Sequence, residues 1–247
     1  MAVKGSSTGA RVLEVFEAVA AHQPVGVAVL SRMLDIDKSA VQRALVTLAE
    51  QGWIQARDDP TTRWETTPRI LNIAHGSRAK ADLRQRVQGV LEQLAVQTGE
   101  TAIFNEPSGS HLVVSQVAES QQPLRMAPRI GALVPARDSA TGRILLPFLS
   151  PERQIELLGA APDVEFRTLL DASRAAGYAA SSEVNAPAMT IAAPVFAVDG
   201  RPIGVVAISG PAERMPPDSH PRLAELVREA AGRLSDGSPP AGHTVVT

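Results

Sequence analysis

One predicted helix, residues 38–51, begins with polar side chains of the kinds that proteins use to contact DNA. An arginine can make two hydrogen bonds to guanine and a glutamine two to adenine, whereas lysine and serine suit phosphate oxygens. The segment that follows, residues 53–67, adds two arginines that could lie along a phosphate backbone or enter a minor groove. The candidate DNA contacts are Lys38, Ser39, Gln42, Arg43, Arg57 and Arg63.

Two further helical patterns precede this helix and must help to position it. Apolar residues recur at helical spacing in residues 12–19 and again in residues 30–34. The sequence Gln23-Pro24-Val25-Gly26 separates the two patterns, and Asp37 is the expected N-cap of the third helix. The front of the chain therefore predicts three short helices in succession.

A small hairpin is expected after the third helix. Residues 53–56 and 63–67 have the composition of short strands, and the turn residues 58–61 lie between them. Three helices and a hairpin in this order are typical of a winged helix-turn-helix, whose recognition helix fits the major groove. The same order also occurs in folds that bind no nucleic acid, so the residues alone leave both readings open.

The pattern changes after a helical stretch over residues 70–98, which is the natural linker between two halves. The rear half alternates β-type runs with amphipathic helices, so the expected fold class is α+β with a mostly antiparallel sheet. We expect strands over residues 101–105, 111–117, 124–127, 190–198 and 202–209, and helices over residues 140–149, 151–158, 166–176 and 221–234.

The composition excludes several classes of protein. The 247 residues are 44% apolar, which is enough for two domains with a core each. The net charge of −2 excludes a globally basic nucleic-acid coat but allows a local basic face. Because there is no cysteine, disulfides, thiolate zinc sites, iron–sulfur clusters and cysteine nucleophiles are excluded. No apolar run reaches the roughly 18 residues of a membrane span and the start lacks a secretory signal, so we expect a soluble, cytoplasmic protein without membrane partners.

Motifs for catalysis are missing from the sequence. It has no Gly-x-Ser-x-Gly, no His-Glu-x-x-His and no phosphate-binding glycine loop. The five histidines are scattered, which predicts no metal site and no cofactor, although a triad assembled across space stays open. Glu100, Glu106 and Glu183 could act as acid and base, but solvated carboxylates are more typical. We therefore predict that the protein is not an enzyme.

Several motifs occur in a specific order along the chain. Asp37-Lys38-Ser39-Ala40-Val41-Gln42-Arg43-Ala44-Leu45 has the form of a recognition helix, and Ala140-Thr141-Gly142-Arg143 and Ser209-Gly210-Pro211-Ala212-Glu213-Arg214 lie in the rear half. Together with residues 10–16, 131–136, 177–179 and 191–196, they resemble the isocitrate lyase regulator (IclR) family of bacterial transcription factors. The resemblance covers roughly residues 9–235.

This resemblance implies a winged helix-turn-helix, a linker helix and a GAF-like effector domain. The expected boundaries are 1–76 for the DNA-binding domain, 77–98 for a linker and dimerisation helix, 99–236 for the effector domain and 237–247 for a disordered tail. The resemblance also implies homodimers, often paired into tetramers, that bind double-stranded promoter DNA and respond to a small metabolite.

The positions of an effector pocket follow from the same resemblance, with departures that bear on the ligand. Where the family usually has a histidine, this chain has Arg137, and where it frequently has a cysteine, this chain has Thr190. Ala180 stands at the position of an acidic pocket residue after Gly-Tyr, and Ala207 stands at the position of one of two pocket serines. These changes predict a less polar floor and an effector larger or more apolar than glyoxylate or pyruvate. The expected effector-binding residues are Ser139, Ala140, Thr141, Ala180, Met189, Thr190, Ala207 and Ser209.

A carboxylate is the expected polar group of that effector. The start of the helix that begins at Ala140 favours an anion, and Arg125, Arg129 or Arg137 could pair with it. Aromatic carboxylates suit a mostly apolar pocket with a single charge.

The preferred prediction is a ligand-responsive regulator, with repression of a catabolic operon as the expected direction. Two alternatives stay open: a sensor-domain enzyme with a vestigial helix-turn-helix, and a protein-interaction module whose front half only dimerises. The regulator is preferred because Lys38, Ser39 and Arg43 match the recognition helix while catalytic motifs are missing.

Overall fold

The computed structural model describes residues 6–58, 61–74, 78–182 and 187–236. The chain divides into two compact units, residues 1–81 and residues 82–247. The division falls inside the helical stretch that the sequence predicted as a linker. The predicted disordered tail, residues 237–247, and the candidate acid Glu183 lie outside the described residues.

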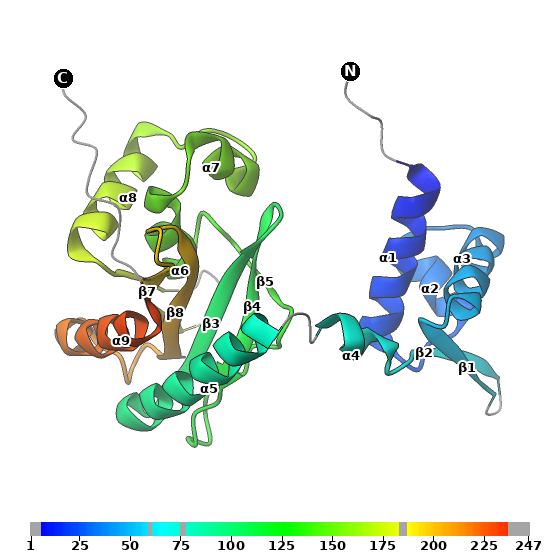
Figure 1. The fold of residues 1–247 in the computed structure, drawn as a ribbon, viewed down its shortest axis with the longest axis horizontal. Helices are drawn as coiled ribbons and strands as arrows, with labels where there is room; N and C mark the ends of the chain where they lie inside the picture. Colours follow the sequence, from blue (N-terminus) through cyan, green and yellow to red (C-terminus); the bar gives the residue numbers. More distant parts are fainter. Residues whose placement is uncertain (1–5, 59–60, 75–77, 183–186, 237–247) are drawn as a thin grey trace. The chain divides into compact units, whose positions relative to one another are not determined.

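The front unit is a helix-turn-helix with a two-stranded wing (Figure 1), as the sequence predicted. Ser6 caps the first helix by accepting the N–H of Gly9, and Asp37 caps the third by accepting the N–H of Ser39. The N-cap of the second helix is Gly26, which has no side chain to accept a capping hydrogen bond. The elements are α1 (Ser7–His22), α2 (Val27–Leu34), α3 (Lys38–Glu50), β1 (Ile54–Asp58), β2 (Thr62–Thr66) and α4 (Arg69–Ala74).

An aliphatic core with one tryptophan holds the front unit together. Residues Val19, Leu30 and Leu45, one from each helix, are fully buried in it. Trp64 of the hairpin packs on the same core, and its backbone exchanges two hydrogen bonds with Val25 in the α1–α2 connection. The wing is therefore fixed to the helical body at its base.

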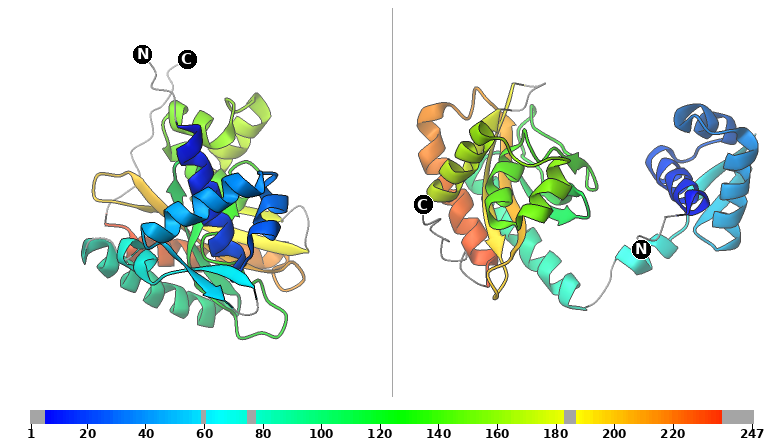
Figure 2. Two further views of the ribbon diagram at one scale, coloured as in Figure 1. Left: turned by 90° about the vertical axis from the view of Figure 1, so that its right-hand side faces the viewer. Right: turned by 90° about the horizontal axis from the view of Figure 1, so that it is seen from above.

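The rear unit is built on a six-stranded antiparallel sheet with strand order β5-β4-β3-β8-β7-β6. Helices α5 and α9 cover one face, whereas α6 lies on the other face with α7 and α8 around it (Figures 1 and 2). The strands are β3 (Thr101–Ser108), β4 (His111–Ala118), β5 (Leu133–Val134), β6 (Ala179–Ser182), β7 (Ala188–Phe196) and β8 (Pro202–Pro211). The helices are α5 (Arg78–Thr98), α6 (Ala140–Leu145), α7 (Pro151–Leu158), α8 (Val164–Ala176) and α9 (His220–Leu234), with short 3-10 turns η1 (Leu146–Phe148) and η2 (Pro217–Ser219).

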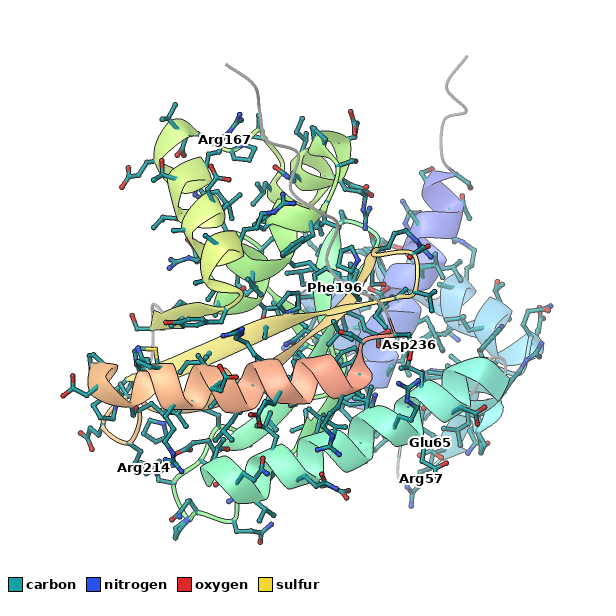
Figure 3. All side chains as sticks on the ribbon, turned by 60° about the vertical axis from the view of Figure 1, so that its left-hand side comes forward. Arg57, Glu65, Arg167, Phe196, Arg214 and Asp236 are labelled. Atoms are coloured by element: carbon teal, nitrogen blue, oxygen red, sulfur yellow. The ribbon has the colours of Figure 1, made fainter. Side chains whose placement is uncertain are left out.

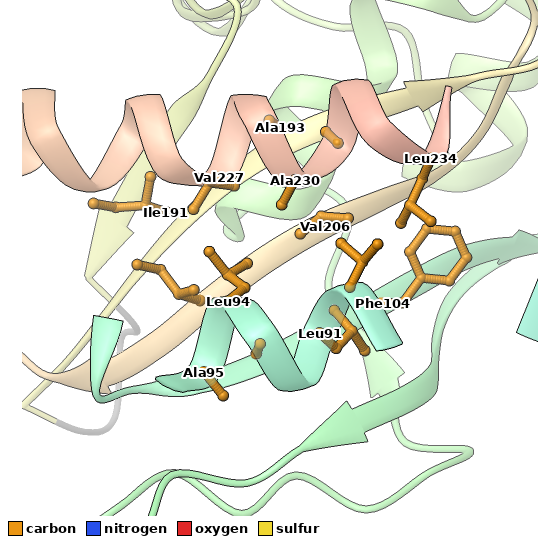
Figure 4. Packing of buried hydrophobic residues seen from close by; sticks show 14 of the residues in the cluster. Leu91, Leu94, Ala95, Phe104, Ile191, Ala193, Val206, Val227, Ala230 and Leu234 are labelled. Carbon is orange, nitrogen blue, oxygen red and sulfur yellow. The ribbon is translucent and has the colours of Figure 1, made fainter. Parts of the chain in front are cut away.

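Helix α5 contributes directly to the larger core of the rear unit. Leu91 and Leu94 are buried against Phe104 of β3 and against α9, which supplies Val227 and Leu234 (Figure 4). The predicted linker helix is thus anchored to the sheet by its apolar side.

Two local predictions for the rear half are wrong in detail, and one strand was missed. Residues 124–127 form no strand, because Pro123 and Pro128 flank them, and the edge strand next to β4 is Leu133–Val134 instead. The predicted helix over 140–149 ends at Leu145, where Pro147 limits the chain to a 3-10 turn. Strand β6 was not predicted, because its sequence Ala-Ala-Ser-Ser has little β-propensity without the partner β7.

Candidate DNA-binding face and buried cavity

The start of α3 presents its polar residues to solvent. Lys38, Ser39, Gln42 and Arg43 are all exposed, whereas the opposite side of the helix is buried in the front core. Arg43 donates from Nη1 to the hydroxyl of Ser39, 3.2 Å away and one turn earlier. This bond orients the guanidinium along the exposed side of the helix and leaves its other donors available.

The N-cap of α3 carries a negative charge close to these side chains. The hydroxyl and then the backbone N–H of Ser39 hold the pKa of the Asp37 carboxyl below its usual value of 3.8. Asp37 therefore stays ionised at neutral pH and keeps the first turn of the recognition helix hydrogen bonded.

Two arginines face each other on the wing. The strand register places Arg57 directly opposite Arg63, and like charges in that position repel. Glu65 lies 3.7 Å from Arg57 and also accepts a hydrogen bond from Gln55 (Figure 3 labels Arg57 and Glu65). Arg57 is 65% exposed, so its charge is presented to solvent, where an anionic partner would relieve the repulsion.

The rear unit contains a cavity of about 510 Å³ on the α6 face of the sheet. Its wall combines apolar side chains, such as Ile103 and Val114, with several hydroxyls and one amide. Five of the predicted effector-binding residues line it: Ser139, Thr141, Thr190, Ala207 and Ser209.

Three predicted residues do not line the cavity, and the alternation of side chains along a strand explains two of them. Thr190 faces the cavity, so its neighbour Met189 points to the opposite face and packs against the core under α5 and α9. Ala180 likewise packs on that core. Ala140, the first residue of α6, is fully buried in the core between α6 and the sheet.

Ser181 is a cavity residue that the sequence reading missed. It pairs with Thr190 in the β6–β7 register and lines the same wall. The pairing of β6 with β7 would have identified it, had β6 been predicted. Asn105 and Asp138 also line the cavity and were not predicted.

Hydrogen bonds divide the polar wall into two groups. Thr190 Oγ1 donates to Ser209 Oγ at 3.0 Å, and Asn105 Nδ2 donates to Thr141 Oγ1 at 3.3 Å. Ser181 Oγ is buried and has no hydrogen-bond partner within the described part of the chain. Ser139 caps α6 by accepting the N–H of Gly142.

The arginines that were expected to meet an anion have other partners. Arg125 donates to Glu119 at 2.8 Å, while Arg137 pairs with Asp163 and lies over the ring of Phe166. The Asp163 bond raises the pKa of Arg137. None of Arg125, Arg129 and Arg137 lines the cavity, and among its described lining residues Asp138 is the single ionisable one.

Glu100 and Glu106, the candidate catalytic carboxylates that the structure describes, are not among the residues that line the cavity. Glu100 is buried and accepts two hydrogen bonds of 2.6 Å from Arg214, which fasten the segment after β8 to the start of β3. Within the described residues, no group of three His, Asp or Glu side chains could hold a metal ion, and no helix is long and apolar enough for a bilayer crossing.

Comparison with known families identifies both units. The sequence model described as the IclR helix-turn-helix domain matches residues 10–58, and that described as the bacterial transcriptional regulator IclR C-terminal matches residues 75–236.

Relatives match over nearly the whole chain. The HTH-type transcriptional regulator BhcR of Paracoccus denitrificans is 28% identical over 243 residues, which cover 93% of this chain and 86% of BhcR. A solved IclR-type regulator from Silicibacter has a TM-score of 0.78 and 22% identity, and covers 95% of this chain and 98% of its own. An IclR homologue from Microbacterium hydrocarbonoxydans was solved in complex with 4-hydroxybenzoate. It has a TM-score of 0.76 and 22% identity, and the match covers 93% of this chain and 98% of the homologue.

Proposed function

Because the chain belongs to the IclR family of bacterial transcriptional regulators, we propose that it represses a catabolic operon and releases promoter DNA when a small carboxylic metabolite fills the rear cavity. The family makes it a ligand-responsive, DNA-binding regulator and not an enzyme. The observation that carries the proposal is the pairing, in one chain, of an exposed polar recognition helix with a cavity of ligand size.

In this proposal the front unit divides the DNA contacts between two elements. Arg43 and Gln42 read base edges, and Lys38 and Ser39 bind phosphates at the start of the same helix. Arg57 and Arg63 hold the backbone or the minor groove from the wing. The exposure of all six side chains and the opposition of the two wing arginines support these roles.

The effector is proposed to be a carboxylate with an aromatic or similarly apolar body. Its carboxylate lies near the start of α6, where Thr141 and Asn105 offer hydrogen-bonding groups beside Ser139, whose hydroxyl already donates to the carbonyl of Pro135, and its body lies against Ile103 and Ala207. No cationic side chain is among the described lining residues, and the ionisable one, Asp138, is exposed to solvent, so hydrogen bonds have to stabilise the anion. The complex of the Microbacterium homologue with 4-hydroxybenzoate supports this class of ligand.

Coupling between the sites requires two copies of the chain. A homodimer, or a dimer of dimers, places two recognition helices about 34–36 Å apart for successive half-sites on the DNA. The predicted domain boundaries, 1–76, 77–98 and 99–236, belong to this proposal, with α5 as the transmitter and dimer surface. A coupling free energy of about 1–3 kcal/mol would change DNA affinity some 5- to 150-fold. The cytoplasm, where the chromosome lies, is the proposed place of action.

Fluorescence anisotropy with the full-length protein tests the proposal. The DNA is a fragment from upstream of the protein's own gene, measured at two salt concentrations against a shuffled fragment. The measurement is repeated with 4-hydroxybenzoate, benzoate and short aliphatic carboxylates. We expect preference for the natural fragment, and weaker binding when one acid is present. Equal binding of both fragments under every condition contradicts the regulator role, and tighter binding with the acid contradicts release.

A further inference from the structure

A row of four hydroxyls crosses the sheet beside the cavity. The register places Ser181 on β6 opposite Thr190 on β7, Thr190 opposite Ser209 on β8, and Ser209 opposite Thr101 on β3. All four side chains are buried. We refer to these residues as the hydroxyl row. Buried hydroxyls destabilise a fold unless they are hydrogen bonded, so the partner of each needs to be identified.

One end of the hydroxyl row is satisfied within the protein, and the other is not. Thr101 Oγ1 donates to the carbonyl of Met126 at 2.6 Å and accepts the N–H of Ser120 at 3.1 Å. Ser209 accepts from Thr190, and no acceptor for its own proton is found among the described residues. Ser181 is 5% exposed, lines the cavity and has no partner in the described part of the chain. The unused hydrogen-bonding capacity therefore faces the cavity.

The second polar group of the cavity lies at a different place along the strands. Asn105, which bonds Thr141, is four residues beyond Thr101 on β3, about 13 Å along the strand. Between them the register pairs Ile103 with Ala207, and both side chains line the cavity. The wall is thus polar at both ends and apolar in the middle.

We propose that the effector carries two polar groups: a carboxylate near α6, and an uncharged hydroxyl or carbonyl group that binds Ser181 and Ser209 in the hydroxyl row. The assignment of the carboxylate depends on the proposed function, whereas the assignment of the second group depends on the unpartnered hydroxyl of Ser181. The second group is uncharged because the hydroxyl row contains neutral donors and acceptors alone, and a second buried charge without a counterion is strongly disfavoured. Ser181 is the residue that selects for this group.

Isothermal titration calorimetry on the full-length protein tests the proposal with two matched pairs of acids. The pairs are 4-hydroxybenzoate with benzoate, and 6-hydroxyhexanoate with hexanoate. We expect at least one hydroxy acid to bind about 10-fold more tightly than its partner, because the partner leaves Ser181 unpaired. Ser181→Ala removes this preference, and the plain acid binds the variant at least as tightly as it binds the wild type, because no hydroxyl is left unpaired. That retained affinity also reports that the variant is folded.

Ser182→Ala is the matched control, since Ser182 is the next residue on β6, is exposed and points away from the cavity. It should keep the full preference for the hydroxy acid. A preference that survives in Ser181→Ala, equal binding within both pairs, loss of both affinities together in Ser181→Ala, or no binding by either hydroxy acid would each overturn the proposal.

A third probe separates this inference from the proposed function. 4-Hydroxybenzyl alcohol keeps the phenolic hydroxyl and lacks the carboxylate. If it binds as tightly as 4-hydroxybenzoate and still depends on Ser181, the carboxylate of the proposed function is wrong and the role of the hydroxyl row is supported. If it does not bind while 4-hydroxybenzoate shows the Ser181-dependent preference, both are supported.

Discussion

The two units place their functional side chains in opposite environments. In the front unit, the candidate DNA contacts are exposed on α3 and on the wing, outside the hydrophobic core. In the rear unit, the candidate ligand contacts are buried on strands whose other residues form the core. Substitutions of the candidate DNA contacts should therefore alter binding without altering stability, whereas substitutions around the cavity should alter both.

The largest expected effect comes from Gly142→Ala. A Cβ at this position would overlap the backbone carbonyl of Ala136, so α6 would have to move away from the segment that forms the cavity wall. Overpacking of this kind should lower the free energy of unfolding by about 3 kcal/mol. Chemical denaturation measures the loss, and calorimetry with the hydroxy acids should show no ligand binding.

Gly232→Ala is the control for that experiment. Gly232 lies in α9, and a Cβ there would meet no atom within 4 Å. Because alanine favours a helix, this variant should be equal to the wild type or more stable by up to about 1 kcal/mol. Equal stability of the two alanine variants would contradict the packing assigned to α6.

The next effect in size is expected at the Glu100–Arg214 pair (Figure 3 labels Arg214). Glu100→Ala removes two hydrogen bonds from a buried carboxylate, but one third of the Arg214 side chain is exposed and can be solvated. We therefore expect a loss of about 2 kcal/mol, less than for a fully buried pair. Urea unfolding of the two single variants, Glu100→Ala and Arg214→Ala, and of the double variant gives the interaction energy between the two side chains. Additive losses would mean that the pair does not act as a unit.

For the DNA contacts we expect a smaller effect on the free energy of unfolding, and the main change should be in the free energy of DNA binding. Arg43→Ala should reduce discrimination between natural and shuffled DNA by about 1–3 kcal/mol. Arg57→Ala should weaken binding to both DNA sequences alike. It should also reduce, by about 1, the slope of the logarithm of the binding constant against the logarithm of the salt concentration. Stability should stay within about 0.5 kcal/mol of wild type in both variants. Equal losses of sequence preference would refute this division of roles, and a large loss of stability would refute the contrast between the units.

The smallest effect concerns the charge of Asp37. Its pKa is lowered in the folded protein, so its ionised form stabilises α3 above the unfolded-state pKa, and this contribution is lost as the pH falls through the folded-state pKa. Asp37→Asn keeps a good N-cap without the charge. The stability difference between wild type and Asp37→Asn should be constant above about pH 5 and shrink below about pH 4. A difference that does not change with pH would show that the charge is not involved.

The sequence predicts the front unit more accurately than the rear unit, for a physical reason. The polar and apolar sides of α3 follow from helical periodicity, and Asp37 marks its start, so the candidate DNA contacts could be assigned from local pattern. The cavity depends on which face of each strand meets it, and a shift of one residue reverses the face. The resemblance to the family placed Ala180 and Met189 in the cavity, whereas the strand register turns both to the other face and brings in Ser181, which was missed.

The polarity of the cavity could not be inferred from the positions that match the family's pocket residues either. Ala180 and Ala207 suggested a less polar floor, but the register adds Ser181 and brings Asn105 to the same wall. Such contacts join residues far apart in the sequence, and no local pattern contains them.

The central claim is that ligand in the rear unit and DNA on the front unit are thermodynamically linked. Calorimetric titration of the tightest-binding acid, with and without a saturating amount of the upstream DNA fragment, measures this linkage directly. Because linkage is reciprocal, the account predicts that DNA weakens the binding of the acid by the same factor by which the acid weakens DNA binding, about 5- to 150-fold. An affinity for the acid that is the same with and without DNA would contradict it.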